Sequence, residues 1–152
     1  MPTRLLPVEH CTQEHEAGCL AACGQMVLRF MGIEQSQHRL NQLLGLTSIG
    51  APYTNITRLA QLDVRITIAT GDQLRLQQSI EQNLPTIAFL FTGELPYWQE
   101  NTPHAVVVVG FDETNCFVND PAFHDAPQVV PWGDFWLAWG EMDYTYAEVL
   151  PQ

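Results

Sequence analysis

The uninterrupted apolar run Ala105–Val109 is the feature that most restricts the fold of this chain. A run of this length suits a buried strand, and it is far shorter than the ~20 residues needed to cross a bilayer. A second run rich in strand-forming residues, "CFVNDP", follows after "DETN", which is a good hairpin signal. The sequence therefore predicts an antiparallel hairpin in a globular core, and no membrane insertion.

The first half of the chain has the periodicity of helices. From Cys19 to Phe30, small and apolar residues recur at the i, i+3, i+4, i+7 spacing of a helix that packs one face on a core, and Gly32 follows as a stop signal. Ser36 and Asp72 are suitable N-terminal caps. Further helices are expected at residues 36–44, 54–62 and 72–83.

The second half is richer in strand patterns. Strands are expected at "VRITIA", "PTIAFLF", "HAVVVVGF", "CFVNDP" and "YTYAEVL", with a short helix at "WGDFWLAW". Helices first and an antiparallel sheet second indicate an α+β fold, with the N-terminal helices packed on a C-terminal sheet. The length of 152 residues suits a single domain, 1–152.

The net charge of the chain indicates which classes of binding partner to expect. The chain has six arginines and no lysine, and its net charge of −11 arises entirely after Arg75. Phosphate binding needs the opposite sign, so no nucleic-acid partner is expected. An acidic surface that aids solubility is the simpler interpretation, and attraction of a basic substrate or partner is the alternative.

The N-terminal stretch "MPTRLLPVEHC" has no long apolar core and no small-residue cleavage site, so we do not expect a signal peptide. A cytoplasmic location follows as the expectation, and there the four cysteines would stay reduced.

The stretch "QEHEAGCLAAC", residues 13–23, allows three interpretations. The first is a zinc site, since His10, Cys11, His15, Cys19 and Cys23 are all soft ligands, but no closely spaced CxxC pair is present. The second is a set of buried core thiols, which suits Cys23 within the helical pattern. The third is a cysteine nucleophile at Cys19, where unpaired backbone N–H groups and the helix dipole favour a thiolate.

A nucleophilic thiolate needs a histidine to take its proton and a third group to orient that histidine. His104 opens one strand and Asp120 ends the next, so hairpin pairing can bring them side by side. The remaining histidines are expected in loops or on a helix surface: His10, His15, His38 and His124. No metal or other cofactor is implied.

The pattern formed by Gln13, Cys19, Ala22, Cys23 and Met26, followed by "HAVVVVGFD" and "VNDPA", resembles the bacteriocin-processing cysteine peptidases that cut double-glycine leaders. These form the papain-like domain at the N-terminus of many peptide-exporting ABC transporters. The resemblance runs from about Leu6 to Leu150. The transporter's membrane and ATP-binding parts are missing, so we expect a free-standing version of this papain-like domain.

The resemblance implies roles for four residues. Cys19 would be the nucleophile, His104 the general acid and base, and Asp120 the residue that orients His104. Gln13 would donate its side-chain amide to the oxyanion, with the Cys19 backbone N–H as the second donor. The family usually has an acidic residue before the cysteine and glycine after it, whereas this chain has Gly18 and Leu20.

The implied activity is cleavage of a peptide after small residues of the Gly-Gly or Gly-Ala type, with a peptide or protein as substrate and a separate exporter as a further partner. Acyl transfer to an amine on the same triad is the first alternative, because water and amine use the same nucleophile, base and oxyanion donors. A non-catalytic peptide-binding module is the second.

Overall fold

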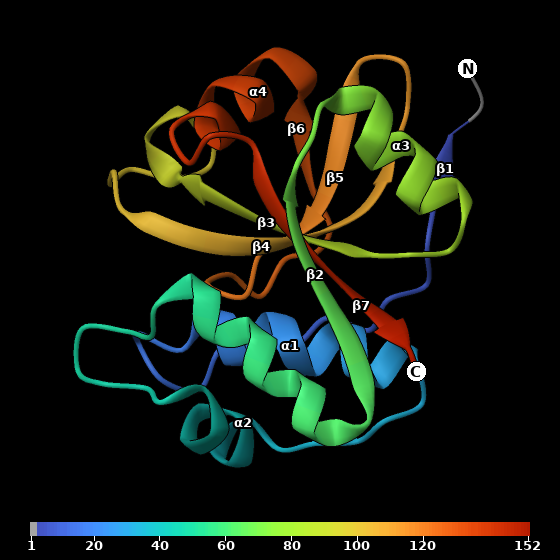
Figure 1. The fold of residues 1–152 in the computed structure, drawn as a ribbon. Coiled ribbons are helices and arrows are strands. Elements are labelled where there is room, and N and C mark those ends of the chain that lie inside the picture. The colour runs from blue at the N-terminus through green and yellow to red at the C-terminus, as the bar shows by residue number, and fades with distance from the viewer. Residues whose placement is uncertain (1–2) are drawn as a thin grey trace.

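The computed structural model describes residues 3–152 (Figure 1). Its helices are α1 (Cys19–Phe30), α2 (Gln37–Leu44), α3 (Gln73–Glu81) and α4 (Trp132–Gly140), with the 3-10 helices η1 (Tyr53–Leu62) and η2 (Thr92–Glu94). Its strands are β1 (Arg4–Leu5), β2 (Val64–Thr70), β3 (Thr86–Phe91), β4 (Pro103–Phe111), β5 (Asn115–Asn119), β6 (Gln128–Pro131) and β7 (Thr145–Pro151). Within this part of the chain, the seven strands form one antiparallel sheet in the order β2-β7-β3-β4-β5-β6, and β1 pairs with β4.

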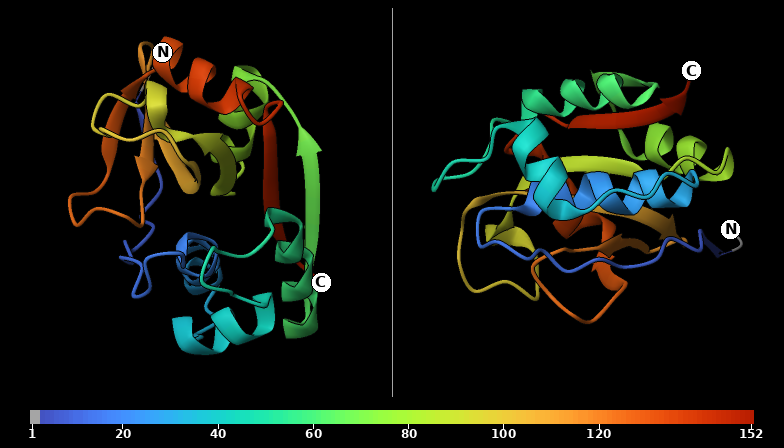
Figure 2. Two further views of the ribbon diagram at one scale, coloured as in Figure 1. Left: turned by 90° about the vertical axis from the view of Figure 1, so that its left-hand side faces the viewer. Right: turned by 90° about the horizontal axis from the view of Figure 1, so that it is seen from below.

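Helices cover both faces of the sheet. α1, α2 and η1 lie on one side, and α3 and α4 lie on the other (Figures 1 and 2). Side chains alternate between the two cores along each strand, so that Ile87 and Phe89 pack toward α1 while Ala88 and Leu90 pack toward α3 and α4. This double coverage explains why β4 is apolar at every position from Ala105 to Val109.

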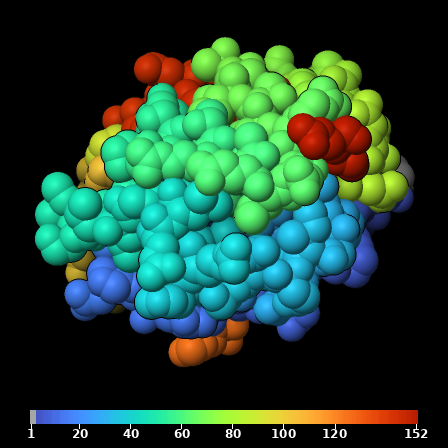
Figure 3. Space-filling model, turned by 60° about the horizontal axis from the view of Figure 1, so that its bottom comes forward, coloured from blue at the N-terminus to red at the C-terminus, as the bar shows by residue number. Residues whose placement is uncertain are grey.

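Helix α1 occupies the centre of its layer. Every residue from Leu20 to Leu28 is buried, so the expected pattern of one apolar face was wrong for this helix. The buried Gln25 is satisfied by donating to the Gln35 carbonyl and accepting from the Gln37 amide. Figure 3 shows the outer face of this layer, which α2 and η1 cover, with the α2–η1 loop projecting from it.

The predicted α+β class is confirmed. Ser36 and Asp72 cap α2 and α3 by accepting from the Arg39 and Arg75 amides at 3.1 and 2.8 Å. Residues 54–62 are helical as expected but fall in the 3-10 helix η1. The short strands β1 and β6 were not predicted, because two to four residues carry too little periodicity. In residues 3–152 no helix is long and apolar enough to span a membrane.

Candidate active site

Cys19 is the first residue of α1 and lines a cavity of about 640 Å³. Gly18 takes the N-cap position and has no side chain that could accept from the first-turn amides. A bulkier residue there would press on the loop, since a Cβ would lie 3.1 Å from the His15 carbonyl oxygen. The sulfur therefore lies at the positive end of the helix dipole and borders this cavity.

The β4–β5 hairpin brings His104 and Asp120 together. The last regular pair is Val107 with Asn119, so Asp120 follows as the next residue, diagonal to His104 on the same face. His104 Nε2 lies 2.7 Å from Asp120 Oδ1, and the two side chains are 6% and 0% exposed. Cys19 lines the same cavity as His104, and its side chain is among the groups that raise the pKa of His104.

The surroundings of Asp120 and His104 favour the charged form of each side chain. Burial lowers the pKa of His104, but hydrogen bonds to Asp120 and Cys19, together with their charges, more than offset it and raise the pKa to about 9. Burial raises the pKa of Asp120, yet the His104, Trp98 and Ala122 contacts bring it below its usual value. His104 is therefore an imidazolium at neutral pH, and its Nε2–H donates a hydrogen bond to the Asp120 carboxylate.

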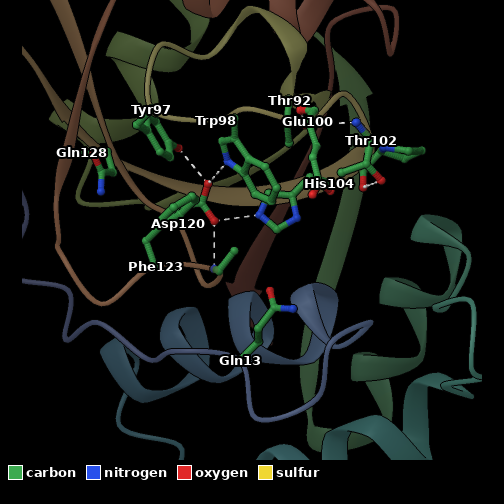
Figure 4. Close-up of polar contacts among 12 residues, drawn as sticks. Gln13, Thr92, Tyr97, Trp98, Glu100, Thr102, His104, Asp120, Phe123 and Gln128 are labelled. Atoms are coloured by element: carbon green, nitrogen blue, oxygen red, sulfur yellow. Dashed lines mark hydrogen bonds and ion pairs between the residues drawn. The ribbon is translucent and has the colours of Figure 1, made fainter.

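Gln13 lines the same cavity, and Figure 4 shows its amide oxygen, not its amide nitrogen, on the side of His104. The amide nitrogen donates to the carbonyl oxygens of His15 and Glu16, at 3.1 and 2.7 Å. Gln13 Oε1 is buried and has no hydrogen-bond partner within residues 3–152. To donate to an oxyanion, Gln13 would have to exchange one of its two loop contacts.

The backbone around Gln13 is tied to two other parts of the chain. Its own N–H donates to the Pro121 carbonyl at 2.7 Å, immediately after Asp120. The buried Gln37 of α2 donates to the Thr12 carbonyl and accepts from the Glu14 amide, each at 2.9 Å. These contacts hold the loop before Cys19 against both the helical layer and the end of β5.

Two residues of this site were not found by sequence reasoning. The Tyr97 hydroxyl and Trp98 Nε1 donate to Asp120 Oδ2 at 2.7 and 2.8 Å (Figure 4). Both residues lie in the segment between η2 and β4, for which the sequence predicted neither helix nor strand. Two aromatic residues beside a proline give no local signal of a shared partner more than twenty residues away.

The other three cysteines are buried: Cys11, Cys23 and Cys116. Burial raises the pKa of each of these thiols, and for Cys23 and Cys116 it does so strongly. Across residues 3–152, no group of three or more His, Cys, Asp or Glu side chains is arranged to hold a metal ion.

Residues 5–147 match the Peptidase_C39 like family, a span that contains all four residues singled out in the sequence. The chain belongs to this family. No match was found among the curated proteins.

Three solved structures share the C39 peptidase fold with this chain. A protein from Bacillus anthracis described as a C39-like peptidase has a TM-score of 0.81 at 16% identity, covering 100% of this chain and 99% of its own. The peptidase domain of Streptococcus ComA, a bi-functional ABC transporter involved in quorum sensing, has a TM-score of 0.79 at 17% identity, with 95% and 99% covered.

The third is a double glycine motif protease from an AMS/PCAT transporter, in complex with its leader peptide. It has a TM-score of 0.76 at 17% identity, and each chain is covered completely. At these identities the similarity establishes the fold, and the predicted papain-like α+β architecture of C39 peptidases is confirmed.

Proposed function

We propose that this C39-like protein is a cysteine peptidase that uses Cys19 as nucleophile, His104 as general acid and base, and Asp120 to orient His104. The observation that carries the proposal is that the helix-start sulfur of Cys19 lines the same cavity as His104, whose Nε2 lies 2.7 Å from a fully buried carboxylate.

The reaction follows from these positions. The Cys19 thiolate attacks the scissile carbonyl, and the His104 imidazolium gives the proton on Nδ1, the ring nitrogen not held by Asp120, to the leaving amine as the C–N bond breaks. Water then loses a proton to His104 as it attacks the acyl-enzyme, and Cys19 leaves as thiolate. The Cys19 backbone N–H and the Gln13 amide are the proposed donors to the oxyanion formed in each step.

The proposed substrate is a peptide with small residues, Gly-Gly or Gly-Ala, before the cut. Leu20 and Ala105 directly follow the nucleophile and the histidine in the chain, and both are buried residues of the cavity lining. An apolar wall this close to the reacting groups leaves little room for large side chains. The leader-bound similar structure supports a peptide substrate, and the transporter-derived ones support a separate exporter as partner.

The substrate is also proposed to be basic near the cut. Among residues 3–152, two exposed carboxylates line the cavity, those of Glu16 and Glu100, and none of the six arginines does so. Localisation in the cytoplasm stays a prediction.

The test is cleavage of synthetic peptides followed by mass spectrometry. Wild-type protein should cut a peptide with Gly-Gly at one defined bond, leave the Val-Val version intact, and lose all activity on Cys19→Ala. An unchanged rate with Cys19→Ala would overturn the assignment of the nucleophile, and no cleavage of any peptide by wild-type protein would overturn the function.

A further inference from the structure

Asp120 accepts an unusually complete set of hydrogen bonds for one carboxylate. Its side chain is 0% exposed, so each lone pair left without a donor would be costly. Oδ1 accepts from His104 Nε2 at 2.7 Å and from the Ala122 amide at 2.9 Å. Oδ2 accepts from the Tyr97 hydroxyl and from Trp98 Nε1, at 2.7 and 2.8 Å.

The two donors to Oδ2 come from consecutive residues. In a strand, neighbouring side chains point to opposite faces and would not meet at one atom. Tyr97 and Trp98 instead leave a turn at Pro96, and Figure 4 shows both side chains converging on the carboxylate. This turn therefore directs two different donors to the oxygen that His104 does not use.

Tyr97 and Trp98 also make contacts between aromatic rings. Phe123, three residues after Asp120, packs edge-on against Tyr97 and Trp98 with ring centroids at 5.1 and 5.2 Å. The Trp98 ring also meets the His104 ring edge-on at 5.0 Å. Trp98 thus contacts both members of the histidine–aspartate pair.

We propose that Tyr97 and Trp98 are positioning residues that lock the rotation of the Asp120 carboxylate and thereby keep Oδ1 aimed at His104. A carboxylate held only through Oδ1 can turn about its Cβ–Cγ bond, and the 2.7 Å contact to His104 lengthens as it turns. Donors on both sides of Oδ2 prevent that rotation. This inference rests on the proposed function, because it assigns a role within the same catalytic site.

Tyr97→Phe removes one hydroxyl and keeps the ring packing. The loss of this donor misplaces a reacting group, so kcat should fall about tenfold. KM should stay unchanged, because Tyr97 is not part of the cavity lining. Trp98→Phe removes the Nε1 donor and should lower kcat similarly. The double variant should lose more than the product of the two single effects, because the donor that remains in each single variant still restrains Oδ2 in part.

Two matched controls are available in the chain. Trp132 Nε1 donates to the Asp112 carbonyl at 3.2 Å, at the opposite end of β4 from His104, and Tyr144 stacks on Trp136 of α4 at 3.9 Å. Trp132→Phe and Tyr144→Phe should therefore leave kcat within about twofold, since neither side chain contacts the catalytic pair.

A double-mutant cycle separates positioning from general stabilisation. In the Asp120→Asn background, Tyr97→Phe should change kcat by less than about twofold, because the carboxylate that Tyr97 holds is gone. An equal loss from Tyr97→Phe in both backgrounds would overturn the proposal, and so would wild-type kcat in the Tyr97→Phe, Trp98→Phe double variant.

A spectroscopic readout is independent of turnover. The His104 Nε2 proton, held against Asp120, should exchange slowly with solvent in NMR spectra of the wild type and faster in both single variants. Unchanged exchange in the double variant would overturn the proposal. If wild-type protein cleaves no peptide, the proposed function fails while this measurement still tests the positioning role.

Discussion

At the scale of single residues, Cys19 differs from the other cysteines in its access to solvent. Burial raises the pKa of Cys11, Cys23 and Cys116, whereas Cys19 borders the cavity that His104 also lines. Iodoacetamide at about pH 6 should therefore label Cys19 well before the other three in the folded protein, as peptide mapping would show. Equal labelling of all four cysteines contradicts the nucleophile assignment.

Asp120 controls the charge of His104. Because the pKa of His104 is raised to about 9, the imidazolium is present below that pH and is lost above it, so kcat/KM should fall above about pH 9. Asp120→Asn removes the hydrogen bond and the charge that raise this pKa. The alkaline limb of the pH profile should then move to lower pH, with residual activity at its maximum.

The control for this change is Asp112→Asn. Asp112 lies in the β4–β5 turn, where it accepts from the Thr114 and Asn115 amides, far along β4 from His104. Asp112→Asn should leave the alkaline limb of the kcat/KM pH profile at its wild-type position. An unmoved limb in Asp120→Asn would show that another group sets the charge of His104.

Substitution of Gln13 tests whether its side-chain amide donates to the oxyanion. Gln13→Ala should lower kcat by about 10²–10³-fold, equivalent to ~3–4 kcal/mol, with little change in KM, because the donor acts only as charge develops. Steady-state kinetics on the Gly-Gly peptide would measure it. If kcat stays within about threefold, the two contacts that Gln13 makes to His15 and Glu16 are its whole role.

At the scale of secondary-structure elements, α2 supports the site through Gln37. This buried residue bridges Thr12 and Glu14 on either side of Gln13 and also donates to Gln25 of α1. Gln37→Ala leaves these buried groups without partners, so the free energy of unfolding should fall on the order of 2 kcal/mol. Denaturant titration would measure that loss.

The same variant should also lower kcat, since the loop before Cys19 is no longer held. Gln42→Ala is the matched control, because Gln42 lies exposed on the same helix beside His38. Its stability and kcat should match the wild type. Comparable losses in both variants would point to a general weakening of α2.

At the scale of the whole molecule, the charge of −11 lowers the potential around a cavity that already carries Glu16 and Glu100. Gly-Gly peptides with lysines near the cut should therefore give a higher kcat/KM than the same peptides with glutamates. The preference should shrink from low salt to about 0.5 M salt, as screening predicts.

Glu100→Gln should reduce this preference, and Glu81→Gln should not, because Glu81 is exposed at the end of α3 and does not line the cavity. Equal kcat/KM for both peptides at low salt would show that the acidic surface serves solubility alone.

The sequence by itself determined the local structure and part of the site. Apolar periodicity, caps at Ser36 and Asp72 and the hairpin signal "DETN" are short-range features, and they predicted most elements and the α+β class. The spacing of strand start and strand end in one hairpin also predicted that His104 and Asp120 meet, because antiparallel pairing is nearly a local rule.

Only the tertiary structure decided what surrounds those residues. The burial of α1 on every side depends on the sheet on one face and on α2 and η1 on the other, so its one-faced pattern was misleading. Tyr97 and Trp98 reach Asp120 across more than twenty residues, and the Gln13 amide turns to carbonyls of its own loop. Such contacts depend on the tertiary arrangement of the segments, and no periodicity in the sequence predicts them.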